Sequence, residues 1–106
     1  MVRMRDVREL SARIADEFRP SKIILFGSLA EGRAHAESDV DLMVIMPFAG
    51  RAAEQGRRIL ERVAPRLPVD LMVRTPAQVR RRVAQNDFFL KDVLSKGKLL
   101  YEASHA

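Results

Sequence analysis

A five-residue segment, Val-Asp-Leu-Met-Val, occurs twice in the chain, at residues 40–44 and at residues 69–73. Each copy is short and apolar apart from its aspartate, which is typical of a buried strand. The sequences that flank the two copies differ, so we do not expect a duplicated structural unit. Two strands of one sheet would instead each carry an aspartate, Asp41 or Asp70, at the same position. A buried carboxylate lowers stability unless it is paired or binds a metal ion, so these aspartates require a chemical explanation.

Hydrophobic periodicity divides the rest of the chain into helices and strands. Thr75, followed by Pro76 and then by Gln78, predicts a helix start. Asn86 is predicted to cap a further helix that ends at Gly97. The predicted helices span residues 3–18, 51–65, 76–85 and the segment that contains Phe89, Leu90, Val93 and Leu94. The predicted strands span residues 22–26, 39–46, 69–74 and 98–102, with one helical turn at 28–32 and a polar connection at 33–38.

This pattern predicts an α/β (α+β) fold, in which helices pack on a small mixed sheet of about three or four strands. The chain has 106 residues, 47% of them hydrophobic and 31% charged, which is an ordinary globular composition. That length suffices for one domain, residues 1–106, around one core. No apolar run approaches the roughly 20 residues of a membrane helix. The N-terminus has no apolar signal segment, and there are no cysteines to form disulfides or thiolate zinc sites, so we expect a cytoplasmic protein.

The formal net charge is +5, from 19 Lys and Arg against 14 Asp and Glu. A basic excess is compatible with binding a nucleotide, nucleic acid or an acidic protein, and equally with a merely solvated surface. The aromatic residues are five Phe and one Tyr, with no Trp. Because single-stranded nucleic acid is bound largely by stacking on aromatic side chains, we do not expect nucleic acid as a partner.

Asp39 and Asp41 are two residues apart, so on a strand they project from the same side. If the strand that carries Asp70 lies alongside in register, three carboxylates converge. Such oxygen ligands suit Mg²⁺, or Mn²⁺, far better than zinc. Two ions about 3.5–4 Å apart can hold the attacking and leaving oxygens of a phosphoryl displacement. The residues between and after the aspartates are predicted to face the core: Val40, Leu42, Val44 and Met46.

Gly27 and Ser28 follow the strand at 22–26 and open the predicted helical turn. Backbone N–H groups at such a turn bind phosphate, and glycine lets the backbone approach closely. Arg33 and Ser38, in the connection that follows, are further candidate phosphate ligands. A Gly-Ser pair after a strand is usually only a turn, and a single Asp-x-Asp is usually a surface feature. Their combination with a third aspartate that opens another strand is hard to explain by packing.

The combined pattern resembles the nucleotidyltransferase superfamily that includes DNA polymerase beta. Its signature is an apolar strand, Gly-Ser, a spacer of this length, Asp-apolar-Asp, and a later third acid. Within that superfamily, the small size and the segment FGSLAEGRAHAESDVDLMV are similar to the minimal nucleotidyltransferases (MNT) of bacteria and archaea. One departure is Glu31, since polymerase-like relatives often have a basic residue at this place, directed at the phosphates.

The resemblance implies that Asp39, Asp41 and Asp70 are catalytic and bind two Mg²⁺ ions. Gly27 and Ser28 would hold the phosphates of ATP or another nucleoside triphosphate. The implied reaction transfers a nucleoside monophosphate, AMP if ATP is used, to a hydroxyl of a partner protein and releases pyrophosphate. MNT proteins resemble the antitoxin half of a pair whose other half is a helical HEPN-type protein, so the resemblance implies a hetero-oligomer.

Two alternatives remain open. The chain could be a non-catalytic module that neutralises a toxic partner by masking it, or a regulator that binds nucleotides or nucleic acid. The intact set of three aspartates favours catalysis over masking. A partner is expected to contact the apolar residues Phe88, Phe89 and Leu90 and the basic residues Arg80–Arg82.

Overall fold

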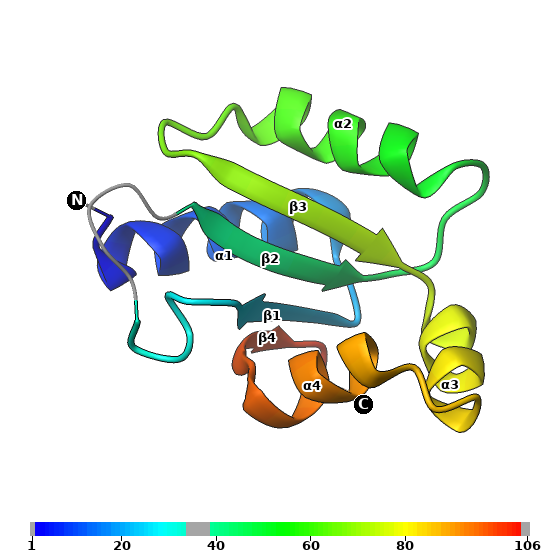
Figure 1. Ribbon diagram of the computed structural model, residues 1–106. Helices are drawn as coiled ribbons and strands as arrows, with labels where there is room; N and C mark the ends of the chain where they lie inside the picture. The colour runs from blue at the N-terminus through cyan, green and yellow to red at the C-terminus, as the bar shows by residue number, and fades with distance from the viewer. Residues whose placement is uncertain (1, 34–38, 105–106) are drawn as a thin grey trace.

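The structure, a computed structural model, describes residues 2–33 and 39–104 (Figure 1). Within these residues, the helices are α1 (Met4–Phe18), α2 (Ala52–Val63), α3 (Pro76–Ala84) and α4 (Phe88–Lys96). The strands are β1 (Lys22–Phe26), β2 (Val40–Ile45), β3 (Val69–Arg74) and β4 (Lys98–Glu102). None of the helices in this part of the chain combines the length and the apolar composition that are needed to cross a membrane.

The strands form one mixed sheet in the order β3-β2-β1-β4. β1 lies antiparallel to both β2 and β4, whereas β2 and β3 run parallel to each other. Parallel neighbours cannot be joined by a tight hairpin, and α2 provides the crossover that connects them. This arrangement of helices on a small mixed sheet is the fold class predicted from the sequence.

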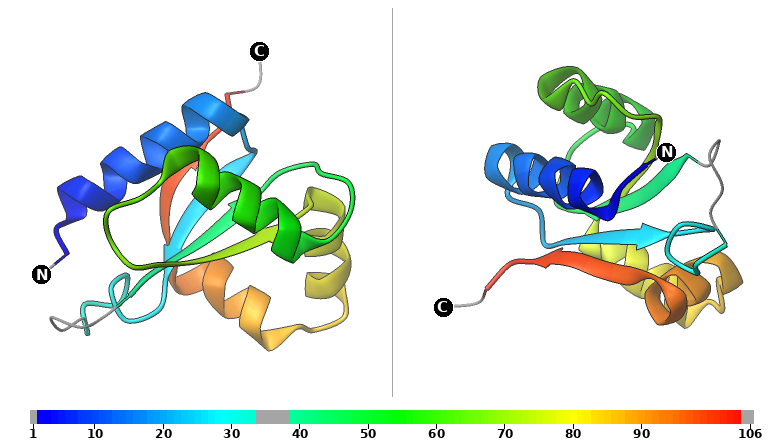
Figure 2. Two further views of the ribbon diagram at one scale, coloured as in Figure 1. Left: turned by 90° about the horizontal axis from the view of Figure 1, so that it is seen from above. Right: turned by 90° about the vertical axis from the view of Figure 1, so that its left-hand side faces the viewer.

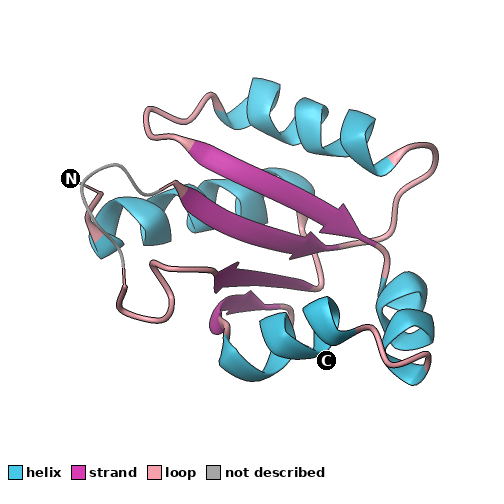
Figure 3. Cartoon of the chain, viewed as in Figure 1, coloured by secondary structure: helices cyan, strands magenta, loops and turns pink. Residues whose placement is uncertain are grey.

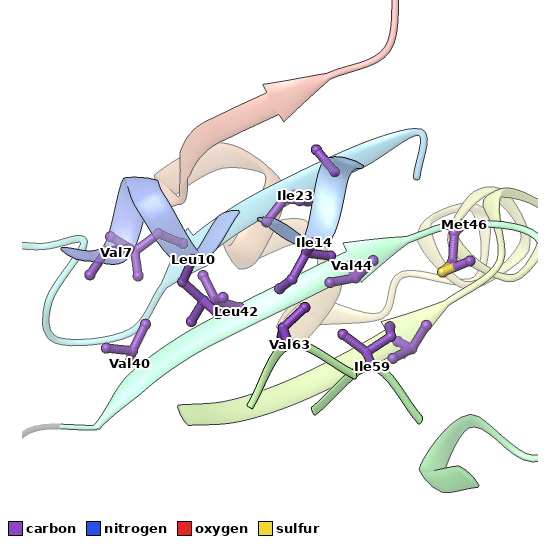
Figure 4. Packing of buried hydrophobic residues seen from close by; sticks show 13 residues of the cluster. Val7, Leu10, Ile14, Ile23, Val40, Leu42, Val44, Met46, Ile59 and Val63 are labelled. Carbon is purple, nitrogen blue, oxygen red and sulfur yellow. The ribbon is translucent and has the colours of Figure 1, made fainter. Parts of the chain in front are cut away.

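The two faces of the sheet are covered by different helices (Figure 2). α1 and α2 contact each other and lie on one face, and α3 and α4 lie on the other. β2 sends alternate side chains into the core beneath α1 and α2 (Figure 4). The residues that do so are those predicted: Val40, Leu42, Val44 and Met46. Because side chains alternate along a strand, Asp41 and Met43 point to the opposite face.

That opposite face carries a second apolar cluster. Ile24 of β1 and Met43 of β2 pack there against Leu90 and Val93 of α4. Because its other side chains belong to the core beneath α1, β1 is buried on both faces, as predicted. α3 follows the C-terminal end of β3 directly, so on the face that carries α3 and α4 the N-terminal ends of β2 and β3 are the less covered ends of the sheet (Figure 1).

β2 begins at Val40, one residue later than predicted. In the parallel ladder, pairing starts with Val40 opposite Val69. The residue before Val69 is Pro68, which has no N–H to donate to a ladder. Its carbonyl accepts a hydrogen bond from the Val40 N–H at 2.9 Å, and that contact closes the ladder. Asp39 therefore lies just outside the strand.

The helix ends also correct the sequence prediction. α4 is capped by Asp87 and not by Asn86: Asn86 is left-handed (φ 60), while Asp87 is extended and accepts a hydrogen bond from the Leu90 N–H at 3.0 Å. α2 ends at Val63 because Ala64 turns into the left-handed region (φ 42). α2 also begins one residue later than predicted, and α1 and α3 are each one residue shorter.

The predicted start of α3 is present as a capping box. The Gln78 N–H donates to Oγ1 of Thr75 at 3.1 Å, and the Thr75 N–H donates to Oε1 of Gln78 at 2.9 Å. Replacing Thr75 by Ala should lower the free energy of unfolding by about 1 kcal/mol, because a helical N–H loses its acceptor. Urea denaturation measures the loss. Thr75→Ser keeps the hydroxyl and should retain most of the stability, and equal losses in both variants would contradict the capping role.

Candidate active site

Asp41 of β2 and Asp70 of β3 are directly paired in the parallel ladder. Paired residues on neighbouring strands point to the same face and are about 4.8 Å apart along the hydrogen-bonding direction. Asp41 is half-buried and Asp70 is exposed. The register that the sequence prediction required is thus present, and it brings two carboxylates together at the less covered end of the sheet.

The pKa of Asp41 is raised above its ordinary value of 3.8. Burial is the largest cause, because it penalises the charged carboxylate, and the negative charges of Asp70 and then of Asp39 add to it. Asp39 itself is exposed, and it precedes β2 instead of lying on it. Negative charge from three aspartates is therefore concentrated around Asp41, even though only two of them belong to the ladder.

Gly27 lies against the Asp41 carboxylate. Its backbone is left-handed (φ 77), and a Cβ atom placed on it would overlap the carboxylate of Asp41. A side chain at this position would therefore be both strained and blocked. The glycine lets the turn after β1 approach Asp41.

The rest of this turn is irregular (Figure 3). The Glu31 N–H donates to the carbonyl of Gly27 at 3.2 Å, and the Arg33 N–H donates to the carbonyl of Ser28 at 2.9 Å. One helical-type turn thus forms where it was predicted, and it does not extend into a helix. The Arg33 guanidinium forms an ion pair with Glu31 at 3.3 Å. Ser38, the other candidate phosphate ligand, lies outside the described residues.

A divalent ion fits this donor set as an open site. Within residues 2–33 and 39–104, no three His, Cys, Asp or Glu side chains are grouped closely enough to hold one ion. Asp41 and Asp70 nevertheless present carboxylate oxygens at one place. Mg²⁺ in proteins often uses only one or two carboxylates and completes its shell with water and substrate phosphate. The chemistry of the residues therefore suits Mg²⁺ without forming a closed cage.

The structure adds a pocket that the sequence did not predict. It has a volume of about 200 Å³ and lies beside Gly27, between the end of β1 with its following turn and one side of α4, from Phe89 to Lys96. Its walls come from opposite halves of the chain, so no local motif could have indicated it. A larger hollow of about 980 Å³ lies between α1 and residues 64–68, but none of the predicted site residues lines it.

The predicted partner surface is only partly exposed. Phe88 is 80% exposed and Phe89 47%, whereas Leu90 is 2% exposed and packs in the cluster beneath α4. The prediction is therefore wrong for Leu90, whose side chain points inward from the helix. Phe89 packs edge-on against Phe26 with ring centres 5.6 Å apart. The basic residues Arg80–Arg82 are all exposed.

The raised pKa of Asp41 has a consequence for stability. A carboxyl whose pKa is higher in the folded state contributes stability below its unfolded pKa, and that contribution is lost as pH rises through the folded pKa. Without divalent ions, Asp41→Asn should therefore stabilise the protein at neutral pH, by up to about 1 kcal/mol.

The measurement is urea unfolding of both proteins at several pH values from 4 to 7, with the difference growing as pH rises. Asp70→Asn serves as the comparison: it removes a neighbouring charge but leaves Asp41 buried, so it should stabilise the fold less. Parallel pH profiles for the unsubstituted protein and Asp41→Asn would contradict the account.

The solved structures that share this fold include the following three. A Sulfolobus solfataricus protein assigned as a nucleotidyltransferase has a TM-score of 0.65 at 19% identity, over 92% of this chain and 78% of that chain. A toxin–antitoxin with AMP-PNP has a TM-score of 0.53 at 20% identity, over 92% and 74%. A mutant of the toxin–antitoxin MntA–HpeT, with two aspartate-to-glutamate substitutions, has a TM-score of 0.52 at 16% identity, over 92% and 74%. At these identities the likeness is one of fold.

Comparison with curated protein sequences gives no significant match. The profile of one protein family, described as the nucleotidyltransferase domain, matches residues 7–100. That range contains all the described strands except the end of β4, together with the paired aspartates and the Gly27 turn. The chain therefore belongs to the nucleotidyltransferase domain family.

Proposed function

We propose that the chain is a Mg²⁺-dependent nucleotidyltransferase of the MNT type. It transfers a nucleoside monophosphate, AMP from ATP, to a hydroxyl of a helical HEPN-type partner, and it acts as the antitoxin half of that pair. The observation that carries the proposal is the pairing of Asp41 with Asp70 beside the Gly27 turn, in a chain of the nucleotidyltransferase domain family. Acids at this position have no packing role that would explain them.

The fold similarities support the biological context of the proposal. Two of the similar structures are toxin–antitoxin proteins, one of them with the ATP analogue AMP-PNP. The proposal extends that context to this chain, together with a single domain at residues 1–106 and a cytoplasmic location. It treats the whole chain as one unit that binds the nucleotide, with the acceptor supplied from outside.

Asp41 and Asp70, with Asp39 beside them, are the residues that would hold Mg²⁺. A bound divalent ion neutralises the triphosphate and polarises the phosphorus that is attacked. Asp70 lies on an edge strand and is exposed, so an acceptor hydroxyl from another protein can reach it and give up its proton there. Gly27 keeps the turn close to Asp41, and the turn's Ser28 and Arg33 are the proposed phosphate ligands, with Ser38 in the segment that follows.

The acceptor is a separate protein in this proposal, because Asp70 is exposed on an edge strand and residues 2–33 and 39–104 do not enclose it. The exposed rings of Phe88 and Phe89 and the basic residues Arg80–Arg82 are the proposed contact surface. Exposed aromatic residues and arginines are enriched where proteins bind one another. The positive charge of Arg80–Arg82 favours an acidic surface on the partner.

Nucleotide binding should depend on the divalent ion. The triphosphate and the carboxylates around Asp41 are both negative, so ATP should bind weakly in EDTA and at least about tenfold more tightly with Mg²⁺. Isothermal titration calorimetry measures both affinities. Asp41→Asn should abolish the gain from Mg²⁺ and remain folded, while Asp16→Asn, an exposed carboxylate on α1, should behave as the unsubstituted protein. Equal affinity in EDTA and Mg²⁺ would overturn the metal-dependent site.

Transfer should be visible on the partner. After incubation with the proposed helical HEPN-type partner, ATP and Mg²⁺, the partner should gain the mass of AMP, and tyrosine is the expected acceptor. Intact-mass spectrometry detects the gain, which should vanish with the Asp39→Ala/Asp41→Ala double variant. If that variant still binds and silences an unmodified partner, the chain acts by masking instead of catalysis.

A further inference from the structure

The two outer strands of the sheet, β3 and β4, are protected to different degrees. An edge strand presents unpaired N–H and C=O groups to which another strand can bond. On β3, α2 comes so close that a Cβ atom on Gly56 would lie 3.7 Å from the carbonyl of Leu71. The Arg74 carbonyl bonds to the Met46 N–H on the β2 side, so the preceding carbonyl points outward. That carbonyl, of Val73, accepts a hydrogen bond from the Arg74 guanidinium at 2.7 Å, so the chain itself covers part of this edge.

The outer edge of β4 has no comparable cover from the described residues. α4 leads into β4, but its end lies against β1 instead. A Cβ atom on Gly97 would overlap the carbonyl of Val93 and the side chain of Ile24, so only glycine lets the end of α4 lie this close to β1. The helix therefore covers β1, and the main-chain groups on the outer side of β4 stay accessible to a further strand.

The exposed side chains of β4 are charged at both ends of the strand. Lys98 is its first residue and Glu102 its last, and both are exposed. Between them Leu99 is 51% exposed, one of four large apolar side chains that are exposed in the described part of the chain. Leu99 pairs with Ile24, so it lies on the face of the sheet that carries α4. A strand with opposite charges at its ends is complementary to a second copy of itself that runs antiparallel.

We propose that β4 pairs antiparallel with β4 of a second copy of this chain. About a two-fold axis near the middle of the strand, each Lys98 comes beside the Glu102 of the other copy, and each Leu99 is covered by the facing strand. A parallel pair would instead place like charges together. Glu102 also lies 3.7 Å from Lys22 of its own chain, but both side chains are about half exposed, and such pairs are weak. The carboxylate can therefore accept the second lysine.

A bulge limits the strength of this dimer. Leu100 has no residue opposite it on β1, because Ile23 pairs with Tyr101 and Ile24 with Leu99. A bulge increases the twist of a strand and interrupts regular pairing, so only a short stretch of β4 can pair. We expect a reversible dimer with a dissociation constant on the order of 10–100 μM. β3 is at the opposite edge of the sheet, so Asp70 of each copy stays open in the dimer.

The test is sedimentation equilibrium of the full chain at concentrations from about 1 to about 300 μM, which bracket that dissociation constant. Lys98→Glu and Glu102→Lys each place like charges together, and each should weaken the dimer at least about tenfold. The Lys98→Glu/Glu102→Lys double variant should restore it, and an equimolar mixture of the two single variants should form a heterodimer. Lys91→Glu is the matched control, because Lys91 is an exposed lysine of α4 that lies outside β4 and bonds to Asn86.

A monomer at the highest concentration would overturn the inference. A dimer that both single variants leave unchanged forms through another surface, which overturns it as well. Dimers that the single variants lose and that neither the double variant nor the mixture regains would show that the charge pairing is wrong. Circular dichroism of each variant shows whether a loss comes from unfolding. None of these outcomes changes the proposed function, which is tested by nucleotide binding and transfer.

Discussion

The parallel pairing of β2 with β3 is the contact on which the site depends. The pairing starts with Val40 opposite Val69, because Pro68, the residue before Val69, has no N–H to donate. That first pair determines the partner of every later residue in the two strands. A shift of one residue would turn all the side chains of β3 over. Asp70 would then face α2 and an apolar side chain would stand beside Asp41. The register therefore sets the chemistry as much as it sets the packing.

The same strand serves two environments at once. Along β2, Val40, Leu42 and Val44 fill the core beneath α1 and α2, while Asp41 between them faces the other side. The core therefore fixes the position of the carboxylate without touching it. The concentration of negative charge around Asp41 opposes folding in the absence of a cation, and the apolar residues on both sides of it offset that cost. Functional residues often carry such a local penalty.

Much of this could be predicted from the sequence, because the determining signals were local. Continuous apolar runs predicted β1 and β3 with the correct ends, and the threonine–proline–glutamine start predicted α3. The errors arose where a neighbour along the chain or across the sheet decides the outcome. Asn86 and Asp87 are both good capping residues, and the left-handed backbone at Asn86 decided between them. Leu90 was assigned to the surface because the sequence does not show which side of α4 packs against β1.

The site residues show the same difference between what local sequence determines and what distant residues determine. The sequence indicated that Asp41 and Asp70 would meet, because identical segments on adjacent strands align naturally. It could not indicate that Asp39 would fall outside the ladder, since that follows from Pro68, which lies just before the partner strand β3. It also gave no sign of the pocket against α4, whose residues are distant in sequence from Gly27.

The close approach of Gly97 to β1 has a consequence for how the protein is made. Gly97, which follows α4, lies so close to β1 that a Cβ atom on it would overlap the side chain of Ile24. The turn after β1 is synthesised before α4, so these two parts of the fold can meet only once residue 97 has been made. A chain synthesised only as far as β3 already carries the aspartates, but the second face of its sheet is bare. Contacts between residues so far apart in sequence form late, because a long loop must close first. Synthesis through α4, more than the folding of any one strand, therefore decides when both faces of the sheet around the site are covered.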